Sequence, residues 1–257
     1  MQLLIPMVGK SVEEMLDKWD RMMCEKGEVE IEVSEWFQGL TEDVITRMAF
    51  GSSYEQGKAI FRLQSHQMLL AADAFQKDLA REEVLRVCPS RDLPSKDDLA
   101  KLKMLSMILN ESLRLYPPAI ATIRRAKYDV ELGGCRVPRG TELLVPILAV
   151  HHDQAIWGND ANEFNPMRFA DGVSRAAKHP VAFIPFGLGT RTCIGQNLAI
   201  LQAKLVLTIL LQRFSFTLAP SYQHAPTVLM LLYPQHGAPI VFRRLSEDNR
   251  DDREVSC

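Results

Sequence analysis

The stretch Phe186-Gly187-Leu188-Gly189-Thr190-Arg191-Thr192-Cys193-Ile194-Gly195 decides how this chain is interpreted. Its glycines permit a tight turn and a close approach of the backbone to a flat ligand. Cys193 comes just before residues 195–214, which are apolar nearly all round and therefore predict a buried helix. The N–H groups at a helix N-terminus favour a thiolate, which is a soft metal ligand. Arg191 can hold an anion beside it, and Phe186 offers an aromatic wall. A buried structural thiol is the alternative for a lone cysteine, but it does not account for the whole pattern.

Outward from this stretch, the hydrophobic period changes along the chain. Helices are expected over 11–26, 34–50, 58–87, 95–116 and 195–214, where apolar residues recur at helical spacing. Strands are expected over 29–33, 141–150, 214–218, 228–233 and 239–243, with a hairpin over 130–137 that turns at two glycines. The expected fold class is therefore mainly α with small β-hairpins, an α+β arrangement. Residues 246–257 are mostly charged and are expected to be a disordered tail.

Composition excludes several classes of protein. The chain has 257 residues, of which 47% are hydrophobic, and a formal net charge of -2. This balance favours a globular domain and argues against a nucleic-acid binder, which would carry a basic excess. The five cysteines include no C-x-x-C pair, so neither a disulfide framework nor a structural zinc site is expected. No apolar run approaches the ~18 residues that a spanning helix needs, and the first nine residues do not read as a secretory signal.

The cysteine stretch resembles the heme-thiolate signature of the cytochrome P450 family. Glu111-Ser112-Leu113-Arg114 resembles the E-x-x-R of the family's K helix, and residues 164–169 resemble its Pro-Glu-Arg-Phe segment, with Met167 where Glu is usual. The resemblance covers about Val12 to Leu245. Residues 1–77 are similar to the D, E and early F helices, and residues 78–245 are similar to the J and K helices, the cysteine loop, the L helix and the C-terminal strands. The domain is thus expected to be a partial cytochrome P450 domain over 1–245.

A narrower resemblance points to the plant 72 clan, and within it to the steroid hydroxylases that inactivate brassinosteroids. It is carried by residues 50–54, 61–64, 224–227 and 233–239. The activity that this implies is a monooxygenase using O₂ and electrons from NADPH-cytochrome P450 reductase on a hydrophobic, steroid-like small molecule. The implied location is the cytosolic face of the endoplasmic reticulum membrane. No nucleic acid is expected as a partner, and the chain itself is expected to begin inside the fold, without an anchor.

The family resemblance also implies a role for each site residue. The cofactor would be heme b, with Cys193 as the axial iron ligand, since a thiolate pushes electron density onto iron and favours O–O cleavage. Arg191 would pair with a heme propionate, and either Arg124 or Arg125 would pair with the second, because spacing does not choose between them. The cofactor-binding set is completed by Phe186, Gly189 and Gly195.

Two smaller patterns have competing interpretations. Glu111 and Arg114 can meet at i, i+3 on one helix face. Spacing alone would make them an ordinary surface pair, but the family pattern adds Arg168 and implies a buried set that fixes the cysteine loop. His151-His152 suggests a metal site, but adjacent side chains diverge and do not chelate one ion, so both are predicted to be structural.

Part of the family pattern is missing from this sequence. No threonine follows an acidic residue, so the family's oxygen-activating Gly-x-acid-Thr motif is absent and no catalytic residue is assigned. The chain passes directly from F-like to J-like sequence at Lys77-Asp78, where we expect one continuous helix from about Lys58 to Val87. Two functions stay open: a heme-thiolate monooxygenase by family, or a truncated, non-catalytic remnant with weak or no heme binding.

Overall fold

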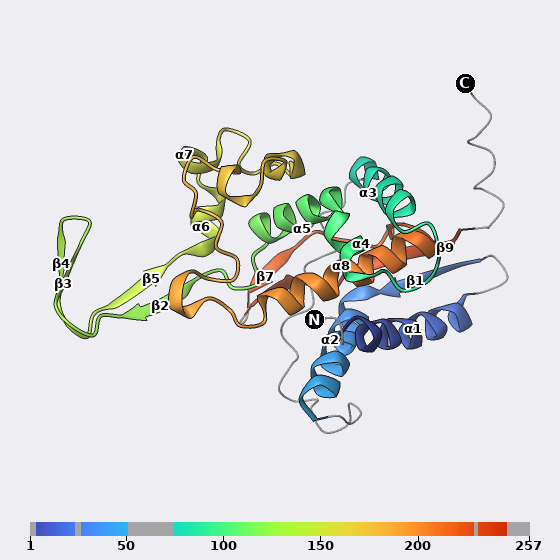
Figure 1. Ribbon diagram of the computed structural model, residues 1–257. Helices are drawn as coiled ribbons and strands as arrows, with labels where there is room; N and C mark the ends of the chain where they lie inside the picture. The colour runs from blue at the N-terminus through green and yellow to red at the C-terminus, as the bar shows by residue number, and fades with distance from the viewer. Residues whose placement is uncertain (1–3, 24–26, 51–73, 229–230, 246–257) are drawn as a thin grey trace.

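The computed structural model describes residues 4–23, 27–50, 74–228 and 231–245 (Figure 1). The α-helices are α1 (Leu4–Met22), α2 (Val33–Phe50), α3 (Ala74–Val87), α4 (Lys96–Lys101), α5 (Lys103–Leu115), α6 (Ile147–His152), α7 (Gln154–Trp157) and α8 (Gln196–Arg213). Short 3-10 helices cover Pro166–Phe169 (η2), Val173–Arg175 (η3) and Gly189–Arg191 (η4). The strands are β1 (Glu28–Glu32), β2 (Thr122–Arg125), β3 (Val130–Leu132), β4 (Cys135–Val137), β5 (Glu142–Val145), β6 (Phe214–Leu218), β7 (Pro226–Val228), β8 (Leu232–Pro234) and β9 (Pro239–Arg244). The α+β class predicted from the sequence is confirmed.

Helix α8 is the centre of the core, as Figure 1 shows. It is apolar nearly all round because α1, α3, α4 and α5 all pack against it. Leu205 and Leu210 are completely buried. At about 25 cal/mol per Å² of apolar surface removed from water, each buried leucine contributes roughly 1.5–3 kcal/mol. Burial of most residues from Leu201 to Gln212 thus holds α8, whose first turn follows the cysteine loop.

A three-stranded antiparallel sheet joins the two ends of the described chain. Its strand order is β1-β9-β6, with Ile31 opposite Ile240 in one ladder and Phe216 opposite Phe242 in the other. Trp19 of α1 packs on Phe242 with ring centroids 4.8 Å apart. The sheet thereby closes one side of the helical core.

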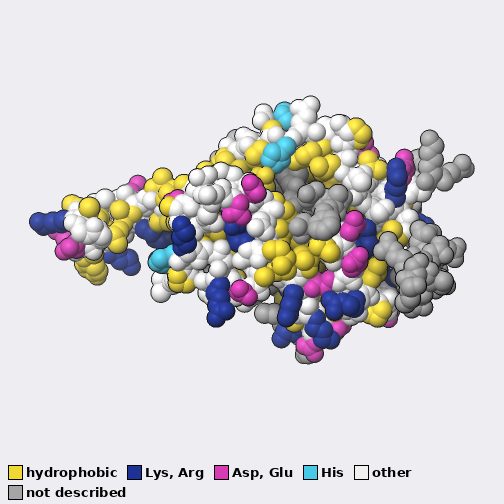
Figure 2. Space-filling model, turned by 90° about the horizontal axis from the view of Figure 1, so that it is seen from above, with side chains coloured by type: hydrophobic (Ala, Val, Ile, Leu, Met, Phe, Trp, Pro, Cys, Tyr) yellow, Lys and Arg dark blue, Asp and Glu magenta, His cyan; other side chains and the backbone are white. Residues whose placement is uncertain are grey.

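A long β-extension projects from the other end of the molecule (Figure 1). It consists of two antiparallel pairs, β2 with β5 and β3 with β4, and the second pair is the hairpin predicted over 130–137. Both turn glycines, Gly133 and Gly134, have positive φ angles of 57° and 79°. Figure 2 shows charged side chains of both signs together with apolar ones on this extension.

The helix predicted over 95–116 is in fact two helices. The capping pair is present, because the Ser95 side chain accepts from the Asp98 N–H and the Asp98 side chain accepts from the Ser95 N–H. However, α4 ends after Lys101, and Leu102 leaves the helical region at φ −73° and ψ 84°. The Glu83 carboxylate then accepts the backbone N–H groups of residues 103, 104 and 105 at 2.8–3.1 Å. A side chain from α3 therefore supplies the N-terminal cap of α5, which local sequence did not reveal.

Other boundaries also differ from the prediction. The strand expected over 141–150 ends at Val145, because Pro146 has no N–H for the ladder, and residues 147–152 form α6 instead. The first helix spans 4–22 rather than 11–26, and the strand expected over 228–233 is divided between β7 and β8. Lys77 and Asp78 lie within the continuous helix α3, whereas its predicted extension to Lys58 lies outside the described residues. The tail 246–257 and residues 51–54 and 61–64 also lie outside them. Within the described parts, no helix is long and apolar enough to cross a membrane.

Candidate functional site

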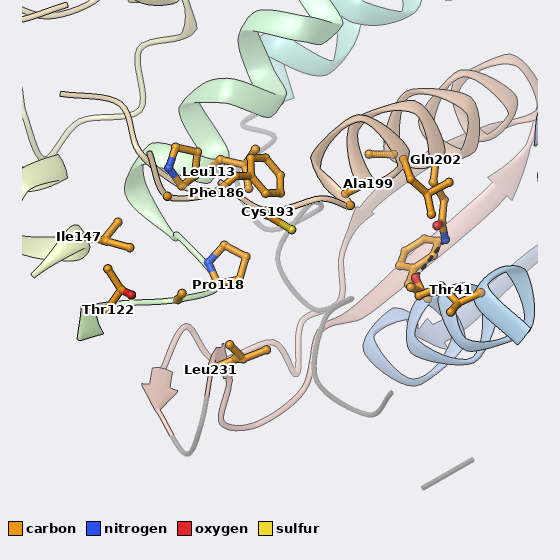
Figure 3. A pocket seen from close by; sticks show the side chains of 18 of the residues that line it. Thr41, Leu113, Pro118, Thr122, Ile147, Phe186, Cys193, Ala199, Gln202 and Leu231 are labelled. Carbon is orange, nitrogen blue, oxygen red and sulfur yellow. Dashed lines mark hydrogen bonds between the residues drawn. The ribbon is translucent and has the colours of Figure 1, made fainter. Parts of the chain in front are cut away.

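A largely apolar cavity of about 380 Å³ lies where the C-terminal end of α5, strand β2, the cysteine loop and α8 meet α2 (Figure 3). Its lining includes Phe37, Leu40, Ile45, Leu113, Pro118, Ile147, Phe186, Leu198, Ala199, Val206 and Leu231 as apolar members. The polar members are Thr41, Thr122, Arg124, Arg191, Cys193 and Gln202. Among the described residues of this lining, Cys193 is the only one whose side chain is a ligand that metals commonly take in proteins.

The cysteine loop is a closed turn that presents the Cys193 sulfur to the cavity, as Figure 3 shows. The Cys193 N–H donates to the Phe186 carbonyl at 2.8 Å, which joins the two ends of the turn. Gly187 and Gly189 have φ angles of 76° and 72°, a conformation that side-chain-bearing residues rarely adopt. The Cys193 thiol is free and solvent-accessible. The turn therefore holds an accessible thiol at the wall of an apolar cavity.

Strand alternation separates the two adjacent arginines of β2. Successive side chains of a strand point to opposite faces. Arg124 lines the cavity, whereas Arg125 donates to the Glu142 carboxylate at 2.6 Å on the exposed side. Arg191, from the cysteine loop, also lines the cavity. The structure thus brings Arg124, Arg191 and Cys193 to one cavity and leaves Arg125 outside the lining.

Glu111 and Arg114 form a buried ion pair at the base of the site, and both side chains have 0% exposure. The Glu111 carboxylate accepts from Arg114 Nε at 2.7 Å and from Arg114 Nη2 at 2.8 Å. Arg168 reaches the same carboxylate with Nε at 3.4 Å, and its Nη2 donates to Asp160 at 2.8 Å. The hydrogen bond from Arg168, followed by one from Asn165, lowers the pKa of the Asp160 carboxyl. These residues are a buried set and not a surface pair.

Arg114 uses all five of its N–H donors. Besides the two bonds to Glu111, it donates to the carbonyls of His151, Ala161 and Glu163 at 2.6–3.1 Å. Its guanidinium also lies over the Trp157 ring, 5.1 Å from the centroid. Arg114 therefore holds the α6–α7 region and the chain before η2 against α5. Met167 of η2 is exposed and takes no part in this network.

The two histidines of α6 have different surroundings. His151 is completely buried, whereas His152 bonds with the Asn162 side chain and the Leu115 carbonyl nearer the surface. Within the described residues, no three His, Cys, Asp or Glu side chains gather in a way that could hold a metal ion. Trp157 is buried in a second, smaller apolar cluster with Phe169, as a core aromatic would be.

Sequence reasoning missed the far end of the cavity. There Gln202 of α8 donates to Thr41 of α2 at 3.0 Å, beside Phe37 and Leu40 (Figure 3). Residues 34–50 read as an amphipathic helix, but nothing in their pattern indicated that this helix would face the cysteine loop. The available signal was Gln202, a polar residue within the largely apolar helix α8.

Comparison with known proteins identifies the class of protein to which this cavity belongs. A family model described as Cytochrome P450 matches residues 69–239, which contain the cysteine loop and the Glu111–Arg114 pair. The chain belongs to the cytochrome P450 family of monooxygenases. Most of the lining of the cavity, including Cys193 and both of its arginines, lies within the matched residues.

Relatives then place the chain in the 734A subfamily of the 72 clan. It is 53% identical to cytochrome P450 734A1 of Arabidopsis thaliana over 98% of this chain and 68% of that protein. It is 44% identical to cytochrome P450 734A6 of Oryza sativa subsp. japonica over 95% of this chain and 66% of that protein. A more distant relative, 11-oxo-beta-amyrin 30-oxidase of Glycyrrhiza uralensis, is 33% identical over 94% of this chain.

The alignments also reveal a length difference. The match to the Arabidopsis protein runs over 355 positions, although this chain has 257 residues, so many positions of the relative within the match have no counterpart here. The chain spans about two thirds of the length of the relatives that it matches. This agrees with the sequence-based expectation that an internal part of the family pattern is missing.

Proposed function

We propose that this chain is a heme-thiolate monooxygenase polypeptide in which Cys193 ligates the iron of a heme b. The observation that carries the proposal is the position of an accessible thiol on a glycine-rich turn at the wall of an apolar cavity. Family membership supports heme as the group that this thiol meets.

The residues of the cavity fit a heme in their chemistry. A porphyrin is a flat apolar ring with two carboxylates at one edge, so it needs apolar walls and cations. Leu113, Phe186 and Ala199 are among the apolar walls, and Arg124 and Arg191 supply two guanidinium groups that can bind carboxylates. Arg124 is preferred over Arg125 because Arg125 is engaged by Glu142 outside the lining.

When bound, the heme supplies oxygen activation. The residues of the cavity would bind the heme and orient it. Cys193 would ligate the iron, and the bond from its N–H to the Phe186 carbonyl fixes the turn that carries the thiol. Phe186 and Ala199 line the cavity beside the sulfur and supply apolar surface for the ring. The buried Glu111–Arg114–Arg168 set holds the segments that support the loop.

The substrate class that we propose is a hydrophobic, steroid-like small molecule, as in brassinosteroid catabolism. Ile147 and Leu231 extend the apolar lining away from the sulfur, and the cavity lining contains no acidic side chain among the described residues. An uncharged polycyclic compound fits such a wall better than an ionic one does. The resemblance of residues 224–227 and 233–239 to the brassinosteroid-inactivating hydroxylases supports this class. By the same family argument, the electron donor is NADPH-cytochrome P450 reductase and the location is the endoplasmic reticulum membrane.

A second candidate function is a non-catalytic chain that binds heme weakly or not at all. The positions of the Arabidopsis relative that have no counterpart here favour it, together with the absence of an acid-Thr pair from the sequence. A heme that is covered incompletely stays exposed to water, which weakens both its binding and any oxygen chemistry.

The test is a reduced carbon-monoxide difference spectrum of the purified chain after heme is added. A thiolate-type band that Cys193→Ala abolishes supports heme binding through Cys193. Cys135→Ala is the matched control, because Cys135 is also a free, exposed cysteine, and it should leave the band unchanged. Loss of the band in Cys135→Ala instead would refute the assignment. Turnover of a steroid with reductase supports the monooxygenase, whereas a band without turnover supports the second candidate.

A further inference from the structure

His151 occupies an unusual position, because a completely buried imidazole joins the K-helix arginine to the base of the cysteine loop. It has 0% exposure, and both of its ring nitrogens are hydrogen-bonded. Nδ1 lies 3.1 Å from the carbonyl oxygen of Arg114, and Nε2 lies 3.0 Å from the backbone nitrogen of Ile184. Neither the Glu111–Arg114 ion pair nor the cysteine loop by itself requires a histidine at this position.

The partners fix which ring nitrogen carries the proton. The Arg114 carbonyl is only an acceptor, so Nδ1 must carry a hydrogen and donate to it. The Ile184 N–H is only a donor, so Nε2 must be unprotonated and accept from it. The ring is therefore neutral, in the Nδ1–H form. Burial, together with the nearby charges of Arg114 and His152, lowers the pKa of His151 to about 4, which agrees with a neutral ring.

The bonds on the Arg114 side are reciprocal. His151 donates to the Arg114 carbonyl, and Arg114 Nη1 donates to the His151 carbonyl at 2.8 Å. Because Arg114 is itself held by Glu111, the imidazole is attached to a buried, fully bonded group. The ring also stacks on Phe183, with centroids 5.7 Å apart and planes 22° apart. His151 thus has little freedom to move.

The bond on the other side reaches the loop that carries the thiol. Ile184 is followed by Pro185, which has no N–H, so the Ile184 N–H is the last backbone donor before the loop begins. The Ile184 carbonyl accepts from the Gly187 N–H at 3.0 Å, and the Phe186 carbonyl accepts from the Cys193 N–H at 2.8 Å. The chain of bonds therefore runs from Arg114 through His151 and Ile184 into the turn that ends at Cys193.

We infer that His151 is a positioning residue of the heme-thiolate site: its unprotonated Nε2 holds the Ile184 N–H and so fixes the entry of the cysteine loop against the K helix. Its role at the iron rests on the proposed function, because His151 acts through the loop and does not itself line the cavity. Its role in holding the loop is a property of the chain without heme and can be tested there.

The first experiment measures hydrogen exchange of the Ile184 amide in the full chain without added heme, in four proteins. His151→Gln places an amide oxygen near the position of Nε2 and can still accept from Ile184. His151→Phe keeps the ring packing on Phe183 but accepts nothing. His152→Gln is the matched control on the neighbouring residue. We expect protection in the wild type, His151→Gln and His152→Gln, and exchange about tenfold faster in His151→Phe, as for the loss of one buried hydrogen bond.

The outcomes separate positioning from packing. Wild-type protection in His151→Phe would overturn the proposal, because ring packing alone would then suffice. Faster exchange in both His151 variants would also overturn it, since the acceptor atom would not matter. If the phenylalanine variant fails to fold, the nitrogen chemical shifts of His151 in the wild type decide the matter. The Nδ1–H form supports the proposal, and the Nε2–H or doubly protonated form overturns it.

The second experiment adds heme and records the thiolate-type carbon-monoxide band of the same four proteins. We expect His151→Phe to lose the band at heme concentrations where His151→Gln and His152→Gln keep it. A wild-type chain without any band would refute the proposed heme function, while the exchange result would still stand. A full band in His151→Phe, at every heme concentration that gives one in the wild type, would overturn the positioning role at the iron.

Discussion

Replacing Glu111 by glutamine should be among the most destabilising single substitutions in the chain. The Glu111 carboxylate accepts two bonds from Arg114, one from the Asn165 N–H at 2.8 Å and one from Arg168. Glutamine removes the negative charge and turns an NH₂ group toward donors, which leaves Arg114 buried without a counter-ion. Breaking a buried pair in this way costs about 3–5 kcal/mol, out of the 5–15 kcal/mol typical of the total for a domain.

Urea denaturation of the full chain, followed by circular dichroism, measures this loss. With a slope near 3 kcal/mol per M, we expect the midpoint to fall by about 1 M or more. Glu142→Gln is the control, because the Glu142–Arg125 pair is 57% and 69% exposed and should be worth only ~0–1 kcal/mol. A loss below about 1 kcal/mol in Glu111→Gln would mean that the three carbonyls bonded to Arg114 suffice to hold it, and would refute the reasoning.

Three further predictions concern other parts of the fold. The pKa of His151 in the folded chain lies below its ordinary value of 6.5, at about 4. As the pH drops from 6.5 to 4, the unfolded chain therefore binds a proton at His151 before the folded chain does. The free energy of unfolding should fall over this range by up to ~1.4 kcal/mol per pH unit. Comparison with His151→Gln in urea melts isolates this contribution, and equal pH slopes would contradict it. Glu83→Ala should cost ~1–2 kcal/mol through loss of the α5 cap, and the exposed Glu82→Ala should cost almost nothing; equal melting temperatures would count against the cap. Gly237→Ala should cost at least ~1–2 kcal/mol of stability, because Gly237 has φ 74° and the new methyl would meet the Glu32 carboxylate. An unchanged melting temperature would disprove this.

Much of the fold could be predicted from the sequence where the signal is local. The buried helix α8, the Gly-Gly hairpin and the Ser95–Asp98 capping box all depend on residues within a few positions of one another. The division of 95–116 into two helices could not be predicted, because the cap of α5 comes from Glu83 in another helix. Tertiary contact overrides local propensity there.

The candidate site shows the same limit. The E-x-x-R spacing indicated that Glu111 and Arg114 could meet, but only the fold shows that Arg114 also collects three carbonyls from distant segments. The choice between Arg124 and Arg125 required the direction of β2 relative to the cavity. His151 was predicted to be structural from its adjacency to His152, whereas its link to Ile184 joins residues 33 positions apart, which no local pattern encodes.

The three-stranded sheet has a consequence for how the protein is made. The bond between Arg243 and Glu28 spans 215 positions of the chain, so β1 cannot pair with β9 until all of the residues between them have been synthesised. At a synthesis rate of about 5–20 residues per second, α1 and β1 wait on the order of ten seconds or longer for their partner. During that time Trp19 lacks Phe242, the residue that later covers it. Strand β9 thus completes the core around α1. A pause in translation before Pro239 would leave α1 and β1 without this partner and therefore as a substrate for chaperones.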